Sequence, residues 1–310
     1  MESKVKHLMY VPFTGLGLYG GFRGKRWLRN RVKIFCQFVV PSLLSQSSQN
    51  FIIWVSWRHE DRNLEEVQSL KTYLETLFGR ERVVFTYSGV CFWDDKHPDD
   101  VARLRLINAI HGSTGALLNI LGECDEVLMT IQPSDDCYSL RSVEQIQKYF
   151  HELPDIQALG FKQGYVMDYT TLTVAEWNPN TTPPFFTIRF KKDVFSNPLS
   201  HVEYTGPYKS HEYIGDKLKL GLFEERGFLV GTHGENISTV FTHPFRGKIL
   251  EGQEKEETLK AFGLNQTPPL KLKISLRKAL MRKLPHGWQR KLRYWFGERM
   301  YAKIYEFIRS

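Results

Sequence analysis

The stretch VLMTIQPSDDCYS, residues 127–139, runs from an apolar segment straight into two adjacent carboxylates, Asp135 and Asp136. A short apolar run bounded by a turn is typical of a buried strand. Neighbouring carboxylates repel each other, so this pair either faces a positive partner or lies in solvent at a loop. The pattern of strands and helices around the pair indicates where in the fold these two carboxylates lie.

The chain before residue 127 alternates between strand and helix patterns. Continuous apolar or β-branched runs predict strands at 6–13, 51–57, 82–88 and 125–132. Apolar residues at helical spacing predict helices at 26–40, 63–79 and 98–121. This alternation predicts a largely parallel sheet, and such sheets bind their ligands beyond the carboxyl ends of the strands. The two aspartates follow the fourth strand, at that edge.

The pattern changes after residue 140. A short helix at 141–153 precedes alternating segments within 160–195 that predict antiparallel strands, then a helix at 206–220 and a strand within 228–239. We therefore expect an α/β fold with a mostly parallel central sheet flanked by helices and a mixed second half. Residues 1–140 and 141–250 are expected to be two halves of one domain. A polar linker at 251–270 and a helical tail at 271–310 would follow.

The basic charge of the chain is concentrated in that tail. The chain has 42 Lys+Arg and 34 Asp+Glu, for a net charge of +8. Residues 271–310 contain 12 of the basic residues and only 2 of the acidic ones. Aromatic and aliphatic residues interleave with the cations, which is typical of a helix on an anionic membrane surface. Packing of the tail on the body is an equally open alternative. Nucleic acid is a weaker third partner, because the body itself is nearly neutral.

Cysteine usage and the ends of the chain indicate a compartment. The four cysteines show no CxxC spacing, so we expect neither a zinc site nor a disulfide framework. No apolar run is long enough for a transmembrane helix, and the first residues lack a signal-peptide pattern. We expect a cytoplasmic protein that can associate peripherally with the inner face of the membrane.

Four segments together carry a family resemblance. They are the helix-to-strand block RNRVKIFCQFVVPSLLSQSSQNFIIWVSW (29–57), the strand ending SDD, FKQGYVMD (161–168) and HGENIST (233–239). Over roughly residues 6–245 the chain resembles the rhamnosyltransferase-like glycosyltransferases, which have the GT-A fold. Residues 1–140 would then be a nucleotide-sugar-binding half and 141–250 an acceptor-side half. The resemblance implies a hexosyltransferase of polysaccharide biosynthesis with a nucleotide-sugar donor, rhamnose being one candidate sugar, and a glycan or lipid-linked acceptor.

The resemblance also implies a metal site. In that fold a DxD-type motif holds Mg²⁺ or Mn²⁺ on the donor diphosphate. The family pattern reads like Asp-Ser-Asp-Asp, and here Pro133 replaces the first acid. Asp135 matches the last acid of the DxD pattern, Asp136 is a second carboxylate beside it, and His233 is a candidate third ligand. A polar loop is the equally open alternative for His233.

Two further roles complete the predicted site. Arg29 lies in the family-like block and is the expected contact to the donor phosphates, because a planar guanidinium grips phosphate in a bidentate manner. Glu212, then Asp216, then His211 are the candidates for the base that takes the acceptor proton. The alternative for these three is an ordinary charged helix start. For Asp135 and Asp136 the alternative is capping of the following helix.

Two other functions stay open from the sequence. One is a protein that keeps the scaffold without the chemistry, or binds nucleic acid through the basic tail. The other is a nucleotidyltransferase built on a related sheet.

Overall fold

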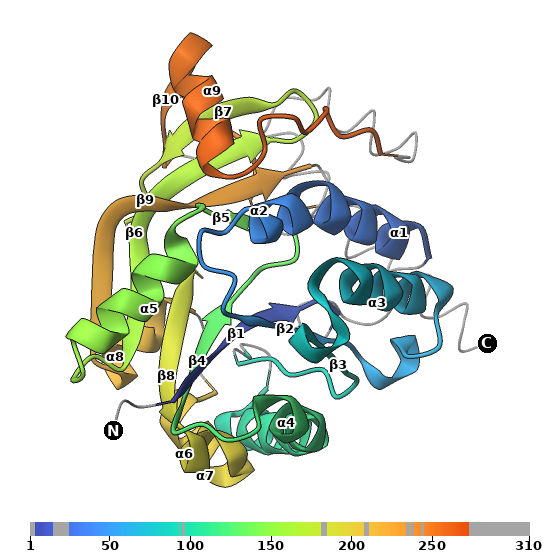
Figure 1. The fold of residues 1–310 in the computed structure, drawn as a ribbon, viewed down its shortest axis with the longest axis vertical. Coiled ribbons are helices and arrows are strands. Elements are labelled where there is room, and N and C mark those ends of the chain that lie inside the picture. The colour runs from blue at the N-terminus through green and yellow to red at the C-terminus, as the bar shows by residue number, and fades with distance from the viewer. Residues whose placement is uncertain are drawn as a thin grey trace.

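The computed structural model describes residues 4–14, 25–92, 94, 97–180, 185–207, 211–233, 236, 239–242 and 245–272. Over these residues ten strands form one curled sheet (Figure 1). Its main path has the order β10-β7-β6-β8-β4-β1-β2-β3, and β5 and β9 pair off this path. The sheet is continuous between the two halves of the chain, because β8 from the second half pairs with β4 from the first.

The first half contains the predicted parallel strands. They are β1 (Val5–Pro12), β2 (Ile52–Ser56), β3 (Val83–Thr86) and β4 (Glu126–Ile131). All three pairings among them are parallel, in the order β3-β2-β1-β4. The predicted α/β class and the parallel first half are confirmed.

Helices bury both faces of these strands. The two long ones are α3 (Glu65–Phe78) and α4 (Asp99–Leu121). Met9 and Val11 of β1 share a core cluster with the apolar face of α3, whereas Leu8 and Tyr10 share one with α4. Successive side chains of a strand point to opposite faces. A strand covered on both faces must therefore be apolar throughout, which is why β1 and β2 read as continuous apolar runs.

One long helical segment connects β1 to β2 and packs in the same core cluster as α3. It consists of α1 (Lys25–Ile34), a π-helical stretch η1 (Phe35–Val39) and α2 (Val40–Leu44). In the π-helical stretch Phe38 stacks flat on Tyr169, with 3.7 Å between ring centroids. The Cys137 Sγ donates to the Phe38 carbonyl oxygen at 3.5 Å. The sequence predicted this helix, but the π-helical stretch has no signal in the apolar spacing.

The strand order reverses between β1 and β4. The chain moves from β1 to β2 and β3 on one side, and β4 then returns to the other side of β1. In open α/β sheets this switch point, at the carboxyl ends of the strands, is where ligands bind. The segment that contains Asp135 and Asp136 leaves β4 there (Figure 1).

The second half is mixed, as predicted. Its elements are β5 (Cys137–Tyr138), α5 (Ser142–Glu152), β6 (Ala158–Asp168), β7 (Thr173–Trp177), β8 (Phe186–Lys191), α6 (Lys192–Ser196), α7 (Pro198–Thr205), η4 (His211–Tyr213), α8 (Ile214–Lys217), β9 (Leu220–Thr232) and β10 (Arg246–Leu250). The pairs β6–β7 and β6–β8 are antiparallel.

The helix predicted over 206–220 is much shorter in the structure. Among the described residues of this range (206, 207 and 211–220), the helical ones belong to η4 and α8, and β9 begins at Leu220. The thirteen residues of β9 pair in parallel with β6 almost along their whole length. The helix ends at Lys217 because Leu218 is already extended and the Lys219 carbonyl oxygen accepts from the Gln157 and Ala158 N–H groups, where the pairing with β6 begins.

Residues 251–270 are not the linker that the sequence predicted. They contain α9 (Gly252–Ala261), after which Phe262, Leu264 and Leu270 are buried in a third core cluster with Phe38 and Tyr169. The polar composition of α9 reflects its exposed face. The predicted tail lies outside the described residues from position 273 onward. Among the helices that the structure describes, none has the length and apolar character needed to cross a bilayer.

Candidate functional site

The two aspartates lie in a tight turn just beyond β4. Asp135 and Asp136 are each 8% exposed. The Gln132 side-chain amide closes the turn by donating to the Pro133 and Asp136 carbonyl oxygens at 2.9 and 2.8 Å. The following helix, α5, begins with Arg141 at its N-cap and has no side-chain cap. The aspartates are therefore buried groups of the turn and do not cap that helix.

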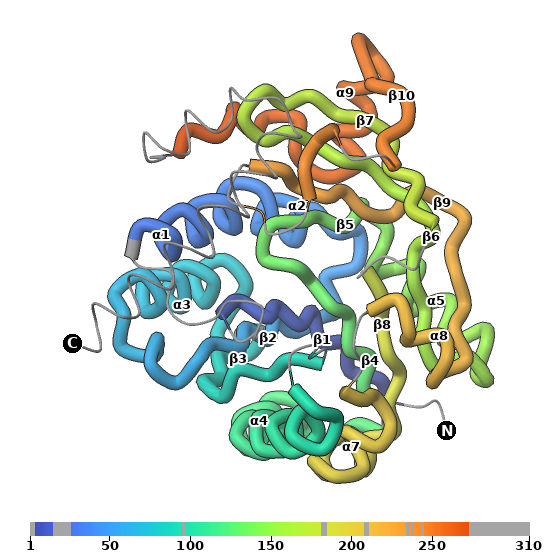
Figure 2. Tube along the Cα trace, turned by 180° about the vertical axis from the view of Figure 1, so that it is seen from behind, coloured from blue at the N-terminus to red at the C-terminus, as the bar shows by residue number. Residues whose placement is uncertain are grey.

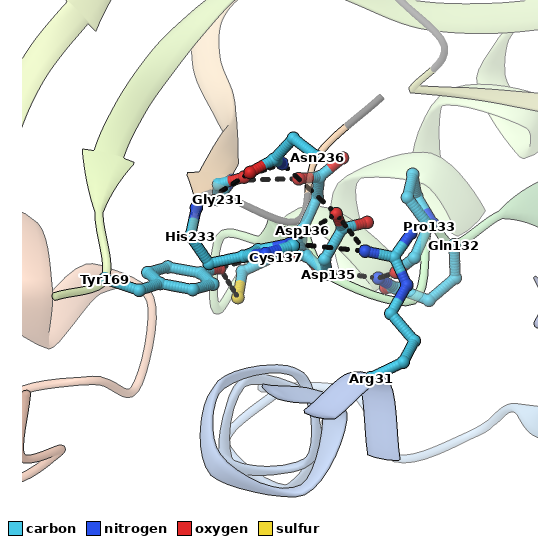
Figure 3. Close-up of polar contacts among 10 residues, drawn as sticks. All are labelled: Arg31, Gln132, Pro133, Asp135, Asp136, Cys137, Tyr169, Gly231, His233 and Asn236. Carbon is cyan, nitrogen blue, oxygen red and sulfur yellow. Dashed lines mark hydrogen bonds and ion pairs between the residues drawn. The ribbon is translucent and has the colours of Figure 1, made fainter. Parts of the chain in front are cut away.

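Asp135 is the centre of a polar network drawn from three parts of the chain (Figure 3). Its Oδ2 accepts from Nη1 of Arg31, a residue of α1, at 2.5 Å. The same oxygen lies 3.0 Å from Nε2 of His233, the residue that directly follows β9. Asn236 Nδ2 lies 3.4 Å from the same oxygen. The positive partner of the acid pair is thus a protein side chain, Arg31.

Arg31 occupies an apolar stripe of its helix. Trp27, Ile34 and Phe38 are buried on that stripe, and Arg31 stands between them at helical spacing with its side chain only 8% exposed. Its guanidinium carbon lies 5.9 Å from the centre of the Trp27 ring, within range of a cation–π contact. A charged residue within an apolar stripe is buried with it and needs a partner, which Asp135 provides.

Arg29, the predicted phosphate contact, points elsewhere. Two residues along a helix are rotated by roughly 200° about its axis, so Arg29 and Arg31 emerge on different sides. The Arg29 side chain is 64% exposed and its Nε donates to Glu66 Oε1 at 2.7 Å. The structure therefore corrects this assignment, and the arginine at the acid pair is Arg31.

Asp136 is held from the opposite side of the turn. Its Oδ1 accepts from the Gly231 backbone N–H at 2.8 Å. Tyr169 Oη donates to the Asp135 carbonyl oxygen at 2.9 Å. A Cβ at position 231 would lie 2.3 Å from both that carbonyl oxygen and the Tyr169 ring. Only glycine lets β9 approach the turn this closely.

The two carboxyl groups have opposite pKa shifts. Burial acts to raise the pKa of Asp135, but the Arg31 guanidinium and the His233 ring outweigh it and hold this pKa at about 2. Burial and the negative charge of Asp135 raise the pKa of Asp136 well above its usual value. The pair is stable because one group is ionised opposite a cation while its neighbour retains a proton to higher pH.

The predicted base residues lie far from this network. Glu212 and His211 are in η4 and Asp216 is in α8, which ends two residues short of the start of β9, whereas His233 follows the last residue of β9. The ribbon and the tube view both place α8 and α1 on opposite sides of the molecule (Figures 1 and 2). The full length of β9 separates these residues from Asp135, so we do not retain them as the base for this site.

The predicted metal ligands are brought only partly together. Asp135 and His233 are in contact, but Asp136 is directed to Gly231. Within the part of the chain that the structure describes, no group of three or more His, Cys, Asp or Glu side chains is arranged to hold a metal ion. The donor set in this arrangement does not fit the divalent cation that the resemblance implies.

Sequence reasoning missed Arg31, Tyr169, Gly231 and Asn236. Arg31 had a usable signal, because it interrupts the stripe formed by Trp27, Ile34 and Phe38. The other three residues are far from Asp135 in the chain, and their contacts depend on how β6 and β9 pair.

Comparison with known proteins gives distant matches. No family model matches the chain, and no curated protein matches it. Among solved structures it is similar to residues 1–349 of S. aureus TarS, at 13% identity and a TM-score of 0.40, over 89% of this chain and 78% of that one. A longer S. aureus TarS structure matches at 14% identity and a TM-score of 0.38, over 91% of this chain and 46% of that one.

A third similar structure is a protein from Desulfovibrio desulfuricans G20 classed as a nucleotide-diphospho-sugar transferase. It matches at 14% identity and a TM-score of 0.32, over 72% of this chain and 80% of that one. Identities and TM-scores this low assign no activity, and we base the proposed function on the site.

Proposed function

We propose that this protein is a glycosyltransferase that takes a sugar from a nucleotide-diphosphate donor. The observation that supports the proposal most directly is the buried Arg31–Asp135–His233 network at the carboxyl end of β4. It places a guanidinium and an imidazole at the switch point of a parallel sheet, where α/β proteins bind nucleotides. A buried ion pair is costly to maintain, and such groups cluster at functional sites.

The sheet supplies a natural place for the donor. The carboxyl ends of β1, β2, β3 and β4 open on one edge, so a nucleotide laid along that edge would bring its diphosphate to the turn after β4. Arg31 suits the diphosphate because guanidinium groups bind phosphate oxygens through paired N–H donors. Asp135 and His233 would hold the guanidinium in place and limit its movement.

The proposed reaction is a single group transfer. The acceptor hydroxyl oxygen forms a bond to the anomeric carbon, and the bond from that carbon to the diphosphate oxygen breaks. The nucleoside diphosphate leaves with the electron pair, and the acceptor proton passes to a base. Negative charge grows on the leaving diphosphate, so a fixed positive group beside it stabilises the transition state more than the ground state.

The finer features follow the sequence resemblance. We propose a hexosyl donor, rhamnose being one candidate, and a glycan or lipid-linked acceptor. The basic tail, residues 271–310, would hold the enzyme at an anionic membrane surface near such an acceptor. Mg²⁺ or Mn²⁺ is the cofactor that the resemblance implies, and the arrangement around Asp135 argues for another source of positive charge.

The proposal is tested by the product formed from nucleotide sugars. The purified chain is incubated with a panel of nucleotide sugars, water serving as the acceptor of the sugar, and release of nucleoside diphosphate is measured by chromatography. We expect release from one donor, its loss in Asp135→Asn, and no loss in the control Asp155→Asn, an exposed acid in the loop after α5.

Two results would contradict the glycosyltransferase assignment. Nucleoside monophosphate as the product would instead indicate a nucleotidyltransferase. No product and no donor-induced rise in melting temperature across the panel would indicate a scaffold without the chemistry.

A further inference from the structure

We propose that Arg31 takes the place of a divalent cation in this site, so that the protein binds the diphosphate of its donor without metal. This inference rests on the proposed function, because it concerns the same diphosphate. It differs from the family expectation of a metal held by acidic side chains, and it follows from how Asp135, Arg31 and His233 are arranged here.

The first argument is electrostatic. Arg31 Nη1 lies 2.5 Å from Asp135 Oδ2 and 3.2 Å from His233 Nε2. The Arg31 and Asp135 side chains are 8% and 11% exposed, and that of His233 is fully buried. A divalent cation bound to Asp135 and His233 would sit against a fixed guanidinium in a poorly screened environment. The position that a metal would need already carries a positive charge.

The second argument concerns the lone pairs that a metal requires. The His233 Nε2 either donates a proton to Asp135 Oδ2 or accepts one from Arg31 Nη1. In the first case Nε2 carries hydrogen, and in the second its lone pair is engaged with Arg31. Either way this nitrogen has no lone pair to give to a metal while the network is intact.

The third argument is the reduced number of acids. Pro133 stands where the family pattern has its first acid, and it has no side-chain oxygen. The Oδ1 of Asp136 accepts from Gly231 N–H on the other side of the turn. Asp135 Oδ2 is shared between Arg31, His233 and Asn236. The first acid of the family pattern is therefore missing, and each remaining carboxylate already has one oxygen engaged with a protein group.

Arg31 has the chemistry to replace the cation. A guanidinium stays protonated at any physiological pH and carries five N–H groups, so it can hold a carboxylate and a phosphate at the same time. Asp135 then acts on Arg31 rather than on a metal. Its carboxylate fixes the guanidinium at the end of β4, which is the preorganisation that makes a charge effective in catalysis.

The first test measures binding rather than turnover. Titration calorimetry follows UDP, GDP and dTDP binding to the full chain, once in EDTA and once in excess MnCl₂. We expect one nucleotide to bind in EDTA with a Kd within about threefold of that in Mn²⁺. Binding that requires Mn²⁺ would overturn this inference and leave the proposed function standing. No binding in either buffer would overturn the proposed function and, with it, the role of Arg31.

The second test asks whether Arg31 is the group that matters. In EDTA, Arg31→Gln is expected to weaken diphosphate binding by about tenfold or more, and Arg31→Lys to recover part of this loss. Arg29→Met, two residues away on the exposed side of the same helix, should bind like the unchanged protein. Folding of each variant is checked by circular dichroism. Unchanged affinity in a folded Arg31→Gln protein would overturn the inference.

The third test uses the metal alone. Mn²⁺ binding to the unchanged protein is followed by electron paramagnetic resonance, without nucleotide. We expect no site that Asp135→Asn removes, because Arg31 already neutralises that carboxylate. A tight Mn²⁺ site that disappears in Asp135→Asn would show that the cation displaces Arg31, and it would overturn the proposal.

Discussion

Strand β4 carries an arginine–carboxylate pair at each of its ends, and the two pairs differ in kind. At the amino end Arg189 Nη2 lies 2.8 Å from both oxygens of Glu126, and the two side chains are 18% and 21% exposed. At the carboxyl end the Arg31–Asp135 pair is more deeply buried and is shared with His233. The first pair joins neighbouring strands β4 and β8, whereas the second joins α1, the turn after β4 and the end of β9.

The surroundings of the two pairs differ as well. Glu126 lines an open depression of about 580 Å³ that also contains Asp125, Lys191 and Lys192, so water reaches the charges there. Arg189 in addition donates to the carbonyl oxygens of Phe150 and Pro154, which fastens the end of α5. The amino-end pair therefore has a sufficient structural explanation. The carboxyl-end pair joins segments that apolar side chains could have held together at a lower desolvation cost. We therefore infer that the Arg31–Asp135 pair has a functional role.

The largest expected effect comes from removing the cation of the buried pair. In Arg31→Met the Asp135 carboxylate loses its main partner, and breaking a buried pair costs about 3–5 kcal/mol of the free energy of unfolding. The measurement is urea denaturation followed by circular dichroism. Asp135→Asn combined with Arg31→Met should recover part of the loss, because no charge is then left unpaired.

Arg189→Met is the matched control for that experiment. Its partner Glu126 stays near solvent, so we expect a loss of about 1 kcal/mol in the same denaturation. Equal losses for the two arginine variants would contradict the distinction between the two ends of β4.

The second effect separates the Asp135 carboxylate from the acid sensitivity of the fold between pH 6.5 and 4. The pKa of Asp135 is lowered from 3.8 to about 2, so its contribution to stability is lost only as the pH falls below about 4. His201 of α7 destabilises the protein at higher pH, because burial lowers its pKa from 6.5 to about 4. The unfolded chain therefore binds more protons between these two values, and stability falls as the pH drops from 6.5 to 4, by about 3 kcal/mol for this group.

The measurement for this effect is the free energy of unfolding at a series of pH values. Since His201 Nδ1 lies 3.0 Å from the Phe195 carbonyl oxygen, His201→Asn keeps a donor near that position without a group that titrates. We expect a flatter pH dependence in this variant, with the remaining slope due in part to His7, whose pKa burial lowers to about 3. An unchanged slope in His201→Asn would refute the assignment.

The third effect concerns the backbone behind the site. In Gly231→Ala the new methyl group would meet the Asp135 carbonyl oxygen and the Tyr169 ring, so we expect a loss of about 1–3 kcal/mol and weaker nucleotide binding. The matched variant is Gly115→Ala in α4, where nothing lies within 4 Å and the helix should gain about 0.5–1 kcal/mol. Thermal unfolding of both variants checks the pair. Similar melting temperatures for the two would contradict the close approach of β9.

The contrast between local patterns and long-range contacts explains what could be predicted from the sequence. The strands and helices around Asp135 were predictable, because continuous apolar runs and helical apolar spacing are local signals. The position of Asp135 at the sheet edge followed from them. Arg31, Gly231 and Tyr169 could not be assigned in the same way, since their contacts form only when α1, β9 and β6 meet at one turn. The two arginines of α1 illustrate this. The family resemblance favoured Arg29, whereas in the structure Arg31 is the arginine buried against Asp135.

The smallest effect on the folded body is expected from removing the tail. Truncation after Leu272 keeps the contacts that fix the preceding segment, namely Leu270 N–H to the Tyr169 carbonyl oxygen at 2.7 Å and Lys33 Nζ to the Lys271 carbonyl oxygen at 2.8 Å. Nucleotide binding and melting temperature should therefore be unchanged. Binding to vesicles containing phosphatidylglycerol should fall about tenfold or more and lose its dependence on salt, because most of the excess positive charge of the chain is removed.

Neutral vesicles serve as the control in a sedimentation assay. If the truncated chain still bound anionic vesicles, the membrane contact would lie on the body, and the exposed charges around the amino end of β4 would be the next place to search.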